Sequence, residues 1–398
     1  MTTLDARRGA QAWFNTSLPR GARVAALLGA MSQSEKLAQL VVDTPAISRL
    51  GVPAYHWRNN VLHGLVDNGV STQFPQAIGM AAAWDVDALH DAARVMADEQ
   101  RAKHNDMIAQ TGGDSPMDYG LDPWGPNLNM FMHPRWGRGQ ETYGEDPILT
   151  SKLATAFISG LQEGPQSVTA LGETLYETLA TCKHYVAYGV DKEPPRLEID
   201  EKISAVDLAQ YYGPAWEACA AEAVSVMCAC GLAADRTRDR SPAVPPPALS
   251  SAAPRSADNG VNGAPMCVSP MIGAALRGEL GFAARPENYV VSDSGALDFT
   301  VSRFHRFNSS LDAAVAAMHA GVDLNSGTVY KQLGAALQQK RVSAAAVAAA
   351  LTRLLHARFA LGLFDPPADI AYSSLGAADV ASPAHMRLAR TVARKALL

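Results

Sequence analysis

Short apolar runs alternate with amphipathic stretches along most of the chain, which is typical of a parallel sheet whose strands are joined by helices. The spacing of apolar residues and the residues suited to capping predict where the helices lie. We expect helices from Ser32 to Val41, from Val86 to about His104, from Pro147 through Phe157, from Asp207 to Val224 after a Ser204 cap, and from Ser343 to Gly362.

The candidate strands are short and apolar, and polar or ionisable side chains follow them. The predicted strands are Leu179–Cys182, Ser225–Cys228, Tyr289–Val291 and Gly321–Leu324. In a parallel barrel, the residues just past the carboxyl end of a strand face the mouth of the active site. The pattern therefore predicts an α/β fold, a (β/α)₈ TIM-barrel-like domain that can be irregular, with its site residues at the strand ends.

The domain organisation follows from where this pattern starts, breaks and stops. We expect an N-terminal extension over residues 1–20 and the barrel over residues 21–380. Segment 231–258 is rich in Pro, Ala, Ser and Arg and has no periodicity, which predicts a disordered insertion. Residues 381–398 form a helical run without a stop signal, so we interpret them as the start of a linker or helix to a second domain.

Charge and composition exclude several classes of partner. The net charge is −5 and no run of Lys or Arg stands out, so we expect neither a nucleic-acid nor an anionic-membrane partner. No stretch approaches the ~20 apolar residues of a membrane span. The cysteines are odd in number and lack paired short spacings, which favours structural thiols over a disulfide scaffold or a zinc cluster. They are Cys182, Cys219, Cys228, Cys230 and Cys267.

Two features carry candidate chemistry. Asp293 follows a β-branched strand on a turn of small residues, where an accessible carboxylate can serve catalysis or simply cap a helix. The block from Trp124 to Pro147 gathers Arg, Glu and Asp around Trp and Gly. Such a cluster suits sugar binding, because charged groups bind hydroxyls and aromatic rings cover the apolar face of the sugar. A buried salt-bridge network fits the same block equally well.

Several phrases in this chain resemble the signature motifs of family-3 glycoside hydrolases, in the same order along nearly the whole chain. Residues 134–147 read P-R-W-G-R-G-Q-E-T-Y-G-E-D-P, close to the family's R-D-P-R-W-G-R-G-Q-E-T-Y-G-E-D-P. The others are F-P-Q-A-I-G at 74–79, K-H at 183–184, V-M-C at 226–228, V-N-G-A-P at 261–265, V-S-D at 291–293 and A-G-V-D-L at 320–324. The β-xylosidase-like branch is the most similar one.

The resemblance implies a function and a set of site residues. It makes Asp293 the nucleophile of a retaining mechanism with a covalent intermediate. It makes Lys183, His184 and Arg138 hydroxyl-binding residues for the sugar at the non-reducing end. The implied substrate is a small oligosaccharide or glycoside with β-linked xylose or glucose. No cofactor or metal is implied, and an extracellular or cell-wall location is expected.

The chain also departs from the family pattern. Residues 55–64 align with a phrase usually written W-W-N-E-A-L-H-G, and the sugar-binding carboxylate of that phrase falls on Asn60. An amide keeps the hydrogen bonding but loses the charge-assisted strength. Met132-His133 replaces the usual Arg-Asp, and the tyrosine that follows V-M-C in the family has no counterpart. In two-domain members the acid/base glutamate comes from the second domain, so no residue here is assigned as the proton donor.

Three interpretations remain open at this point. The first is an exo-acting glycosidase, incomplete as given. The second is a non-catalytic or inactive sugar-binding remnant, which Asn60 and the absent tyrosine favour. The third is a single-barrel β-N-acetylhexosaminidase of the same family, whose histidine proton donor follows the K-H strand. It ranks last, because the segment from Val186 to Arg196 contains no histidine.

Overall fold

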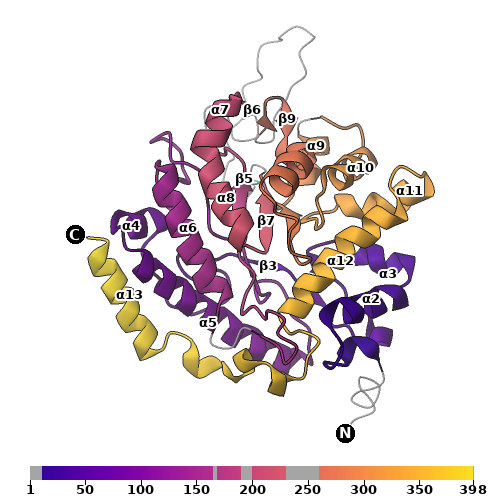
Figure 1. Cartoon of the computed structure of the whole chain (residues 1–398), viewed down its shortest axis with the longest axis horizontal. Coiled ribbons are helices and arrows are strands. Elements are labelled where there is room, and N and C mark those ends of the chain that lie inside the picture. Colours follow the sequence, from indigo (N-terminus) through magenta and orange to yellow (C-terminus); the bar gives the residue numbers. More distant parts are fainter. Residues whose placement is uncertain (1–10, 165–167, 190–199, 230–259, 304, 398) are drawn as a thin grey trace, which may run out of the picture.

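The structure is a computed structural model that describes residues 11–164, 168–189, 200–229, 260–303 and 305–397. The expected insertion at 231–258 therefore lies outside the described residues. Figure 1 shows helices arranged around central strands, with β5 and β7 near the middle of the view. This arrangement matches the alternation of apolar runs and amphipathic stretches in the sequence.

The central strands form a ring. β7 (Ser225–Cys228) pairs in parallel with β5 (Thr181–Tyr185) on one side and with β10 (Tyr289–Ser292) on the other. Beyond β10, parallel bridges join Val291 to Leu324 and Asn325 to Val41. Beyond β5, Lys183 bridges Asn127. That segment follows β4 (Asp122–Pro123), which pairs in parallel with β3 (Arg58–Asn59).

The ring is completed where the segment after Leu40 meets the segment leading into β3. Val42 donates its N–H to Asn325, and its carbonyl accepts from the N–H of Trp57. Here β1 (Asp43–Thr44) and β2 (Tyr55–His56) pair antiparallel. The α/β, TIM-barrel-like fold class is confirmed. The barrel is irregular, because β1 and β2 pair antiparallel whereas the other strand pairs of the ring are parallel.

Helices cover the outside of the ring. In chain order they are α2 (Arg20–Ala30), α3 (Gln33–Ala38), α4 (Ala77–Ala82), α5 (Val86–Thr111), α6 (Pro147–Gln162), α7 (Ala205–Asp207), α8 (Gly213–Glu222), α9 (Ala296–Ser302), α10 (Ser310–Ala320), α11 (Leu333–Gln338), α12 (Ala344–Ala360) and α13 (Pro383–Lys395). Short strands β6 (Asp200–Glu201), β8 (Gly260–Val261) and β9 (Ala264–Pro265) form a separate small sheet. Gly160 lets α6 approach α5 closely, because a Cβ at this position would lie 2.4 Å from the carbonyl oxygen of His90.

Several expected elements differ from the observed ones, since α3 ends at Ala38 instead of Val41 and β5 spans Thr181–Tyr185 instead of Leu179–Cys182. The helix expected from Asp207 to Val224 is divided, since a π-helical turn at Leu208–Tyr212 separates α7 from α8. The strand expected at Gly321–Leu324 is wrong for most of its length. Gly321 ends α10 with a φ of 101°, and of these four residues only Leu324 forms a bridge.

Two disulfides correct the expectation of structural thiols. Cys182 of β5 is bonded to Cys219 of α8, and Cys228 at the end of β7 is bonded to Cys267. The bonded residues are 37 and 39 positions apart in the sequence, so no local spacing signals them. The barrel brings each strand beside a distant segment, with Cα–Cα distances of 6.4 and 5.1 Å that a disulfide can span.

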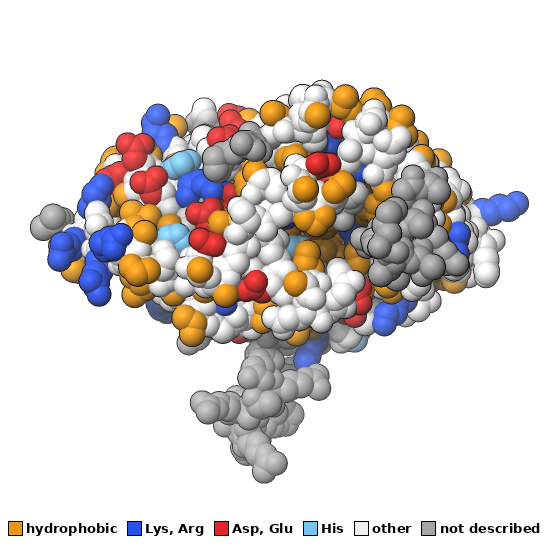
Figure 2. Space-filling view, turned by 90° about the horizontal axis from the view of Figure 1, so that it is seen from below, with side chains coloured by type: hydrophobic (Ala, Val, Ile, Leu, Met, Phe, Trp, Pro, Cys, Tyr) orange, Lys and Arg blue, Asp and Glu red, His pale blue; other side chains and the backbone are white. Residues whose placement is uncertain are grey.

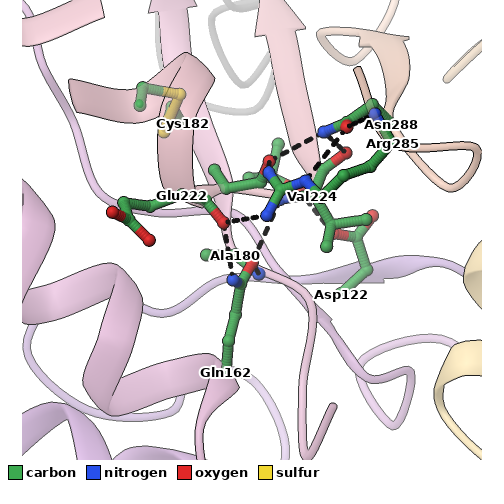
Figure 3. The surroundings of a disulfide bond; sticks show 11 residues. Asp122, Gln162, Ala180, Cys182, Glu222, Val224, Arg285 and Asn288 are labelled. Atoms are coloured by element: carbon green, nitrogen blue, oxygen red, sulfur yellow. Dashed lines mark hydrogen bonds between the residues drawn. A yellow bond between two sulfur atoms is a disulfide. The ribbon is translucent and has the colours of Figure 1, made fainter. Parts of the chain in front are cut away.

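Side chains of Gln162 and Arg285 form hydrogen bonds with the backbone near the Cys182–Cys219 disulfide (Figure 3). The Gln162 side chain donates to the carbonyl of Glu222 at 2.8 Å and accepts from the N–H groups of Ala180 and Val224. Arg285 donates to the same Glu222 carbonyl at 3.0 Å. The backbone leading into β5 and β7 is therefore held from α6 and from the segment before β10.

Both ends of the described chain pack on the barrel. Trp13 is buried and donates its indole N–H to the carbonyl of Leu50. At the other end α13 lies along α5 (Figure 1), and Ala389 and Val392 face the core. Figure 2 shows Lys and Arg side chains gathered at the left end of its face, the side on which Figure 1 places α13.

Candidate active site

A cavity of about 470 Å³ lies where the central strands end. Its lining contains every residue that the sequence predicted for the site, namely Asn60, Arg138, Lys183, His184 and Asp293. Asn60 follows β3 directly and Asp293 follows β10 directly, while Lys183 and His184 belong to β5. The fold therefore brings these residues together from four separate parts of the sequence.

Asp293 is 3% exposed and is oriented by its own turn. Its Oδ1 atom accepts the backbone N–H of Ser294 at 2.7 Å, and its backbone N–H donates to the carbonyl of Cys228. The following Gly295 adopts a φ of 71°, a conformation that glycine reaches without strain and that turns the chain into α9. The other carboxylate oxygen, Oδ2, lies 3.7 Å from Nε2 of His184.

Lys183 and His184 both line the cavity although they are adjacent in a strand. The pairing between β5 and β7 shifts register between Cys182 and Tyr185, which interrupts the usual alternation of side chains. Asn129 fixes His184, since its Oδ1 accepts the His184 backbone N–H at 2.8 Å and lies 3.2 Å from Nδ1. This contact orients the imidazole ring with Nε2 towards Asp293.

The charge of Lys183 is destabilised by its surroundings. Burial lowers the pKa of Lys183 to about 8, and the positive charge of Arg138 acts in the same direction. The carboxylates of Glu141 and Asp293 oppose this shift. The Lys183 ammonium group is therefore ionised at neutral pH and close to its titration range.

Arg138 is held by Glu141 in a bidentate ion pair. Its Nε lies 2.8 Å from Oε1 and its Nη2 lies 2.6 Å from Oε2. Burial opposes the charge of Glu141, but the hydrogen bonds and the charge of Arg138 outweigh it and lower the pKa of Glu141. Because Glu141 stays anionic, it is poorly suited to donate a proton.

Aromatic rings support this corner of the cavity. The ring of Tyr188 contacts the ring of His184 edge to face at 5.4 Å, and the guanidinium carbon of Arg138 lies 5.6 Å from its centroid. The ring of Trp136 also contacts Tyr188 edge to face, with centroids 5.5 Å apart. The signature block at 124–147 thus packs against the K-H strand. The position of the family's tyrosine after V-M-C lies outside the described residues.

The cavity also contains residues that were not predicted as site residues, including Arg58, His63, Gln76, Trp124 and Glu141. Trp124 and Glu141 belong to the signature block, so their motif was a usable signal. Arg58 stands two residues before Asn60, in the phrase at 55–64 that departs from the family pattern. Gln76 and His63 also belong to phrases that resemble the family's, at 74–79 and 55–64, and Nε2 of Gln76 lies 3.1 Å from Nε2 of His63.

Within the described part of the chain, Asp293 and Glu141 are the carboxyl groups that line the cavity. Of these two, Glu141 is held in an ion pair by Arg138. Over the same residues, no three His, Cys, Asp or Glu side chains cluster as a metal site would require. None of the described helices is long and apolar enough to cross a membrane.

Comparison with known proteins places the chain in a family. Residues 22–357 match the model described as the glycosyl hydrolase family 3 N terminal domain. A probable exo-1,4-β-xylosidase of Aspergillus terreus is 35% identical over 396 residues, which cover 95% of this chain and 46% of the relative. A probable β-D-xylosidase of Arabidopsis thaliana is 34% identical, covering 96% of this chain and 47% of the relative.

Solved structures agree with this placement. A family-3 exo-β-xylosidase, solved in complex with a xylobiose aziridine probe, superposes with a TM-score of 0.80 and 26% identity, covering 98% of this chain and 46% of that one. A β-glucosidase of Erythrobacter marinus shares the fold, with a TM-score of 0.74 at 23% identity, covering 98% of this chain and 51% of its own. The chain spans about half the length of these relatives. The barrel, the cavity and the matched residues 22–357 show that this chain belongs to glycoside hydrolase family 3 and carries the N-terminal domain of that family.

Proposed function

We propose that this chain carries the nucleophile and the sugar-binding subsite of a retaining, exo-acting glycoside hydrolase. The substrate is an oligosaccharide or glycoside that ends in β-linked xylose or glucose. The observation that carries the proposal is the cavity in which Asp293, Lys183 and Arg138 converge, close beside His184. Membership of the family and the xylosidase names of its relatives favour the same chemistry.

The proposed step is a displacement at the anomeric carbon. We assign the attack to Oδ2 of Asp293, the carboxylate oxygen that lies 3.7 Å from Nε2 of His184 in the cavity. A bond forms between Oδ2 and the anomeric carbon while the glycosidic bond breaks, and its electron pair leaves with the aglycone oxygen. Water then cleaves the glycosyl ester, which regenerates the carboxylate and retains the anomeric configuration.

The neighbouring side chains bind the sugar in this proposal. Lys183 and Arg138 donate hydrogen bonds to hydroxyl groups, and charge-assisted bonds of this kind are stronger than neutral ones. Trp124 belongs to the cavity lining and can contact the sugar ring there. We propose that the proton donor for the aglycone comes from outside the described residues, since neither carboxyl group of the described cavity is suited to that role.

The test uses aryl β-xylosides and β-glucosides that carry dinitrophenolate, a leaving group that needs almost no protonation. We expect phenolate release by this chain, and loss of at least about a thousandfold in the Asp293→Asn variant, because the nucleophile is removed. Asp91→Asn is the matched control, since Asp91 is an exposed carboxylate of α5. Equal release by the Asp293→Asn variant would rule out the proposal.

One observation favours the alternative of an inactive sugar-binding remnant. Asn60 occupies the cavity wall where the family phrase carries a carboxylate. A folded chain that binds a sugar but releases no phenolate from any dinitrophenyl glycoside would support the remnant instead.

A further inference from the structure

The Cys228–Cys267 disulfide contacts the backbone that supports Asp293. Cys228 is the last residue of β7, and its carbonyl oxygen accepts the backbone N–H of Asp293 at 3.3 Å. The Sγ atom of Cys267 lies 3.3 Å from that same oxygen. Because a sulfur atom in a disulfide has no proton to donate, this is a packing contact and not a hydrogen bond. The disulfide therefore touches the atom that holds the Asp293 backbone.

The position of Cys228 at the end of its strand makes this contact important. Strand ends open more readily than strand centres, and β7 has only four residues. After Cys228 the structure describes Ala229 and then resumes at residue 260. The N–H of Ala229 donates to the carbonyl of Tyr185 on the β5 side. The disulfide adds a covalent link from this strand end to the chain beyond residue 260.

Cys267 is a well-fixed partner for that link. It belongs to the 3₁₀-helical turn η6 (Met266–Val268), which packs against α10. Cys267 is 2% exposed, and the adjacent Met266 is fully buried. Because close-packed core residues move little, the disulfide ties the end of β7 to the helix layer of the barrel.

The other disulfide provides an internal comparison. It joins Cys182 of β5 to Cys219 of α8, and β5 continues for three residues beyond Cys182. The sequence separations of 37 and 39 are nearly equal, so the two bonds constrain the unfolded chain to a similar extent. They differ in place, since Cys182 lies within its strand and Cys228 lies at a strand end against Asp293.

We propose that the Cys228–Cys267 disulfide positions Asp293 for attack on the anomeric carbon. This inference rests on the proposed function, in which Asp293 is the nucleophile. The disulfide holds the Cys228 carbonyl, the carbonyl holds the Asp293 N–H, and the carboxylate then lies in the cavity wall. Misplacement of a reacting atom by about 1 Å can slow a reaction about a hundredfold. A small shift of this backbone therefore affects the chemical step more than sugar binding.

Amide hydrogen exchange tests the positioning without requiring turnover. The variant Cys228→Ala/Cys267→Ala removes this disulfide, and Cys182→Ala/Cys219→Ala is the matched control with the same loss of sulfur. In the first variant we expect exchange in the peptide covering residues 290–296 to accelerate about tenfold, because the strand end opens locally. In the control we expect that peptide to change less than about twofold.

A second variant covers the case in which the first does not fold. Cys228→Val/Cys267→Ala restores apolar volume at the strand end without restoring the bond. We expect the same selective acceleration of exchange in residues 290–296. Circular dichroism establishes that each variant is folded before exchange is measured.

Kinetics distinguish positioning from general loosening of the barrel. Dinitrophenolate release from dinitrophenyl β-xyloside in a single turnover reports the chemical step, and calorimetric titration with methyl β-D-xyloside reports binding. We expect Cys228→Ala/Cys267→Ala to slow release at least about tenfold while sugar affinity changes less than about twofold. We expect the control pair to release phenolate at close to the unmodified rate.

Each other outcome is decisive. Unchanged exchange in residues 290–296, or equal acceleration in both double variants, would overturn the inference. Equal losses of rate and affinity in Cys228→Ala/Cys267→Ala would do the same. If exchange accelerates selectively but the unmodified chain releases no phenolate, the disulfide still holds Asp293 and the proposed function fails. If release depends on Asp293 but is as fast without the Cys228–Cys267 bond, the proposed function stands and the inference fails.

Discussion

Asp122 and Lys183 are buried ionisable side chains in the wall of the barrel, and both have pKa values far from their ordinary ones. Asp122 is fully buried in β4 and accepts a hydrogen bond from the Thr181 hydroxyl. Burial raises its pKa to about 7, although the Thr181 bond acts against the shift. Asp122 is not in the cavity lining, so its titration bears on stability, whereas that of Lys183 bears on binding.

Replacing Asp122 with Asn should stabilise the protein above neutral pH. The folded-state pKa of about 7 lies above the ordinary value of 3.8. The stability that the protonated Asp122 carboxyl group contributes is therefore fully present below pH 3.8 and is lost as pH rises through about 7. At about 1.4 kcal/mol per pKa unit, the loss approaches ~4 kcal/mol at alkaline pH. Denaturant unfolding of both proteins at pH 5 and pH 9 checks this, and parallel pH profiles would contradict it.

The pKa of Lys183 predicts how sugar affinity depends on pH. Since this pKa is about 8, the ammonium group loses its proton, and with it one hydrogen-bond donor, as pH rises through that value. We expect binding of methyl β-D-xyloside to weaken above pH 8 and Lys183→Met to bind weakly, without that pH dependence. Calorimetric titrations between pH 6 and pH 9 measure both effects. A flat profile for the unmodified chain would refute the assignment.

Among the elements, helix ends follow most directly from the sequence, because a cap is a local interaction. Ser32 and Glu35 form the expected capping box of α3, and Ser343 caps α12 as predicted. The Val86 helix was predicted too short, and it continues to Thr111 before Gly112 ends it. Elements that depend on distant partners were harder to predict, and the residues after Gly321 join the ring through isolated bridges.

Glu99 of α5 holds α13 against the barrel. It is 1% exposed, and it accepts hydrogen bonds from the backbone N–H groups of Thr72 and Ala381 at 2.8 and 2.9 Å. His385 of α13 adds a contact of 2.9 Å to Oε1. The carboxylate therefore joins the segment before α4 to the start of α13.

Replacing Glu99 with Ala should destabilise the protein by about 3 kcal/mol, because several buried donors lose a charged acceptor at once. Amide exchange should become faster in α13 than in α6 or α12. Exposed Glu217 of α8 provides the control variant Glu217→Ala, which we expect to be neutral. Unchanged exchange in α13 of the Glu99→Ala variant would show that this contact does not hold the helix.

On the scale of the whole molecule, the fold class and the place of the site could be predicted, but long-range chemistry could not. The predicted strands that end at Cys182 and just before Asp293 are followed by polar residues. This pattern was enough to place Lys183, His184 and Asp293 together at one end of the barrel. Pairing of Cys182 with Cys219 depends on how α8 lies against β5, which no spacing in the sequence records. Arg58 was missed for a similar reason, since its place in the cavity lining depends on how β3 lies against distant segments.

The central claim is that Asp293 forms a covalent bond with the sugar. Incubation with a dinitrophenyl glycoside of a fluorinated sugar, which forms the intermediate quickly but releases it slowly, followed by peptide mass analysis, tests this claim most directly. The account predicts one added sugar on the peptide that contains Asp293, and none in the Asp293→Asn variant. A sugar bound to another residue, or phenolate release from the folded chain without a trapped intermediate, would contradict the account.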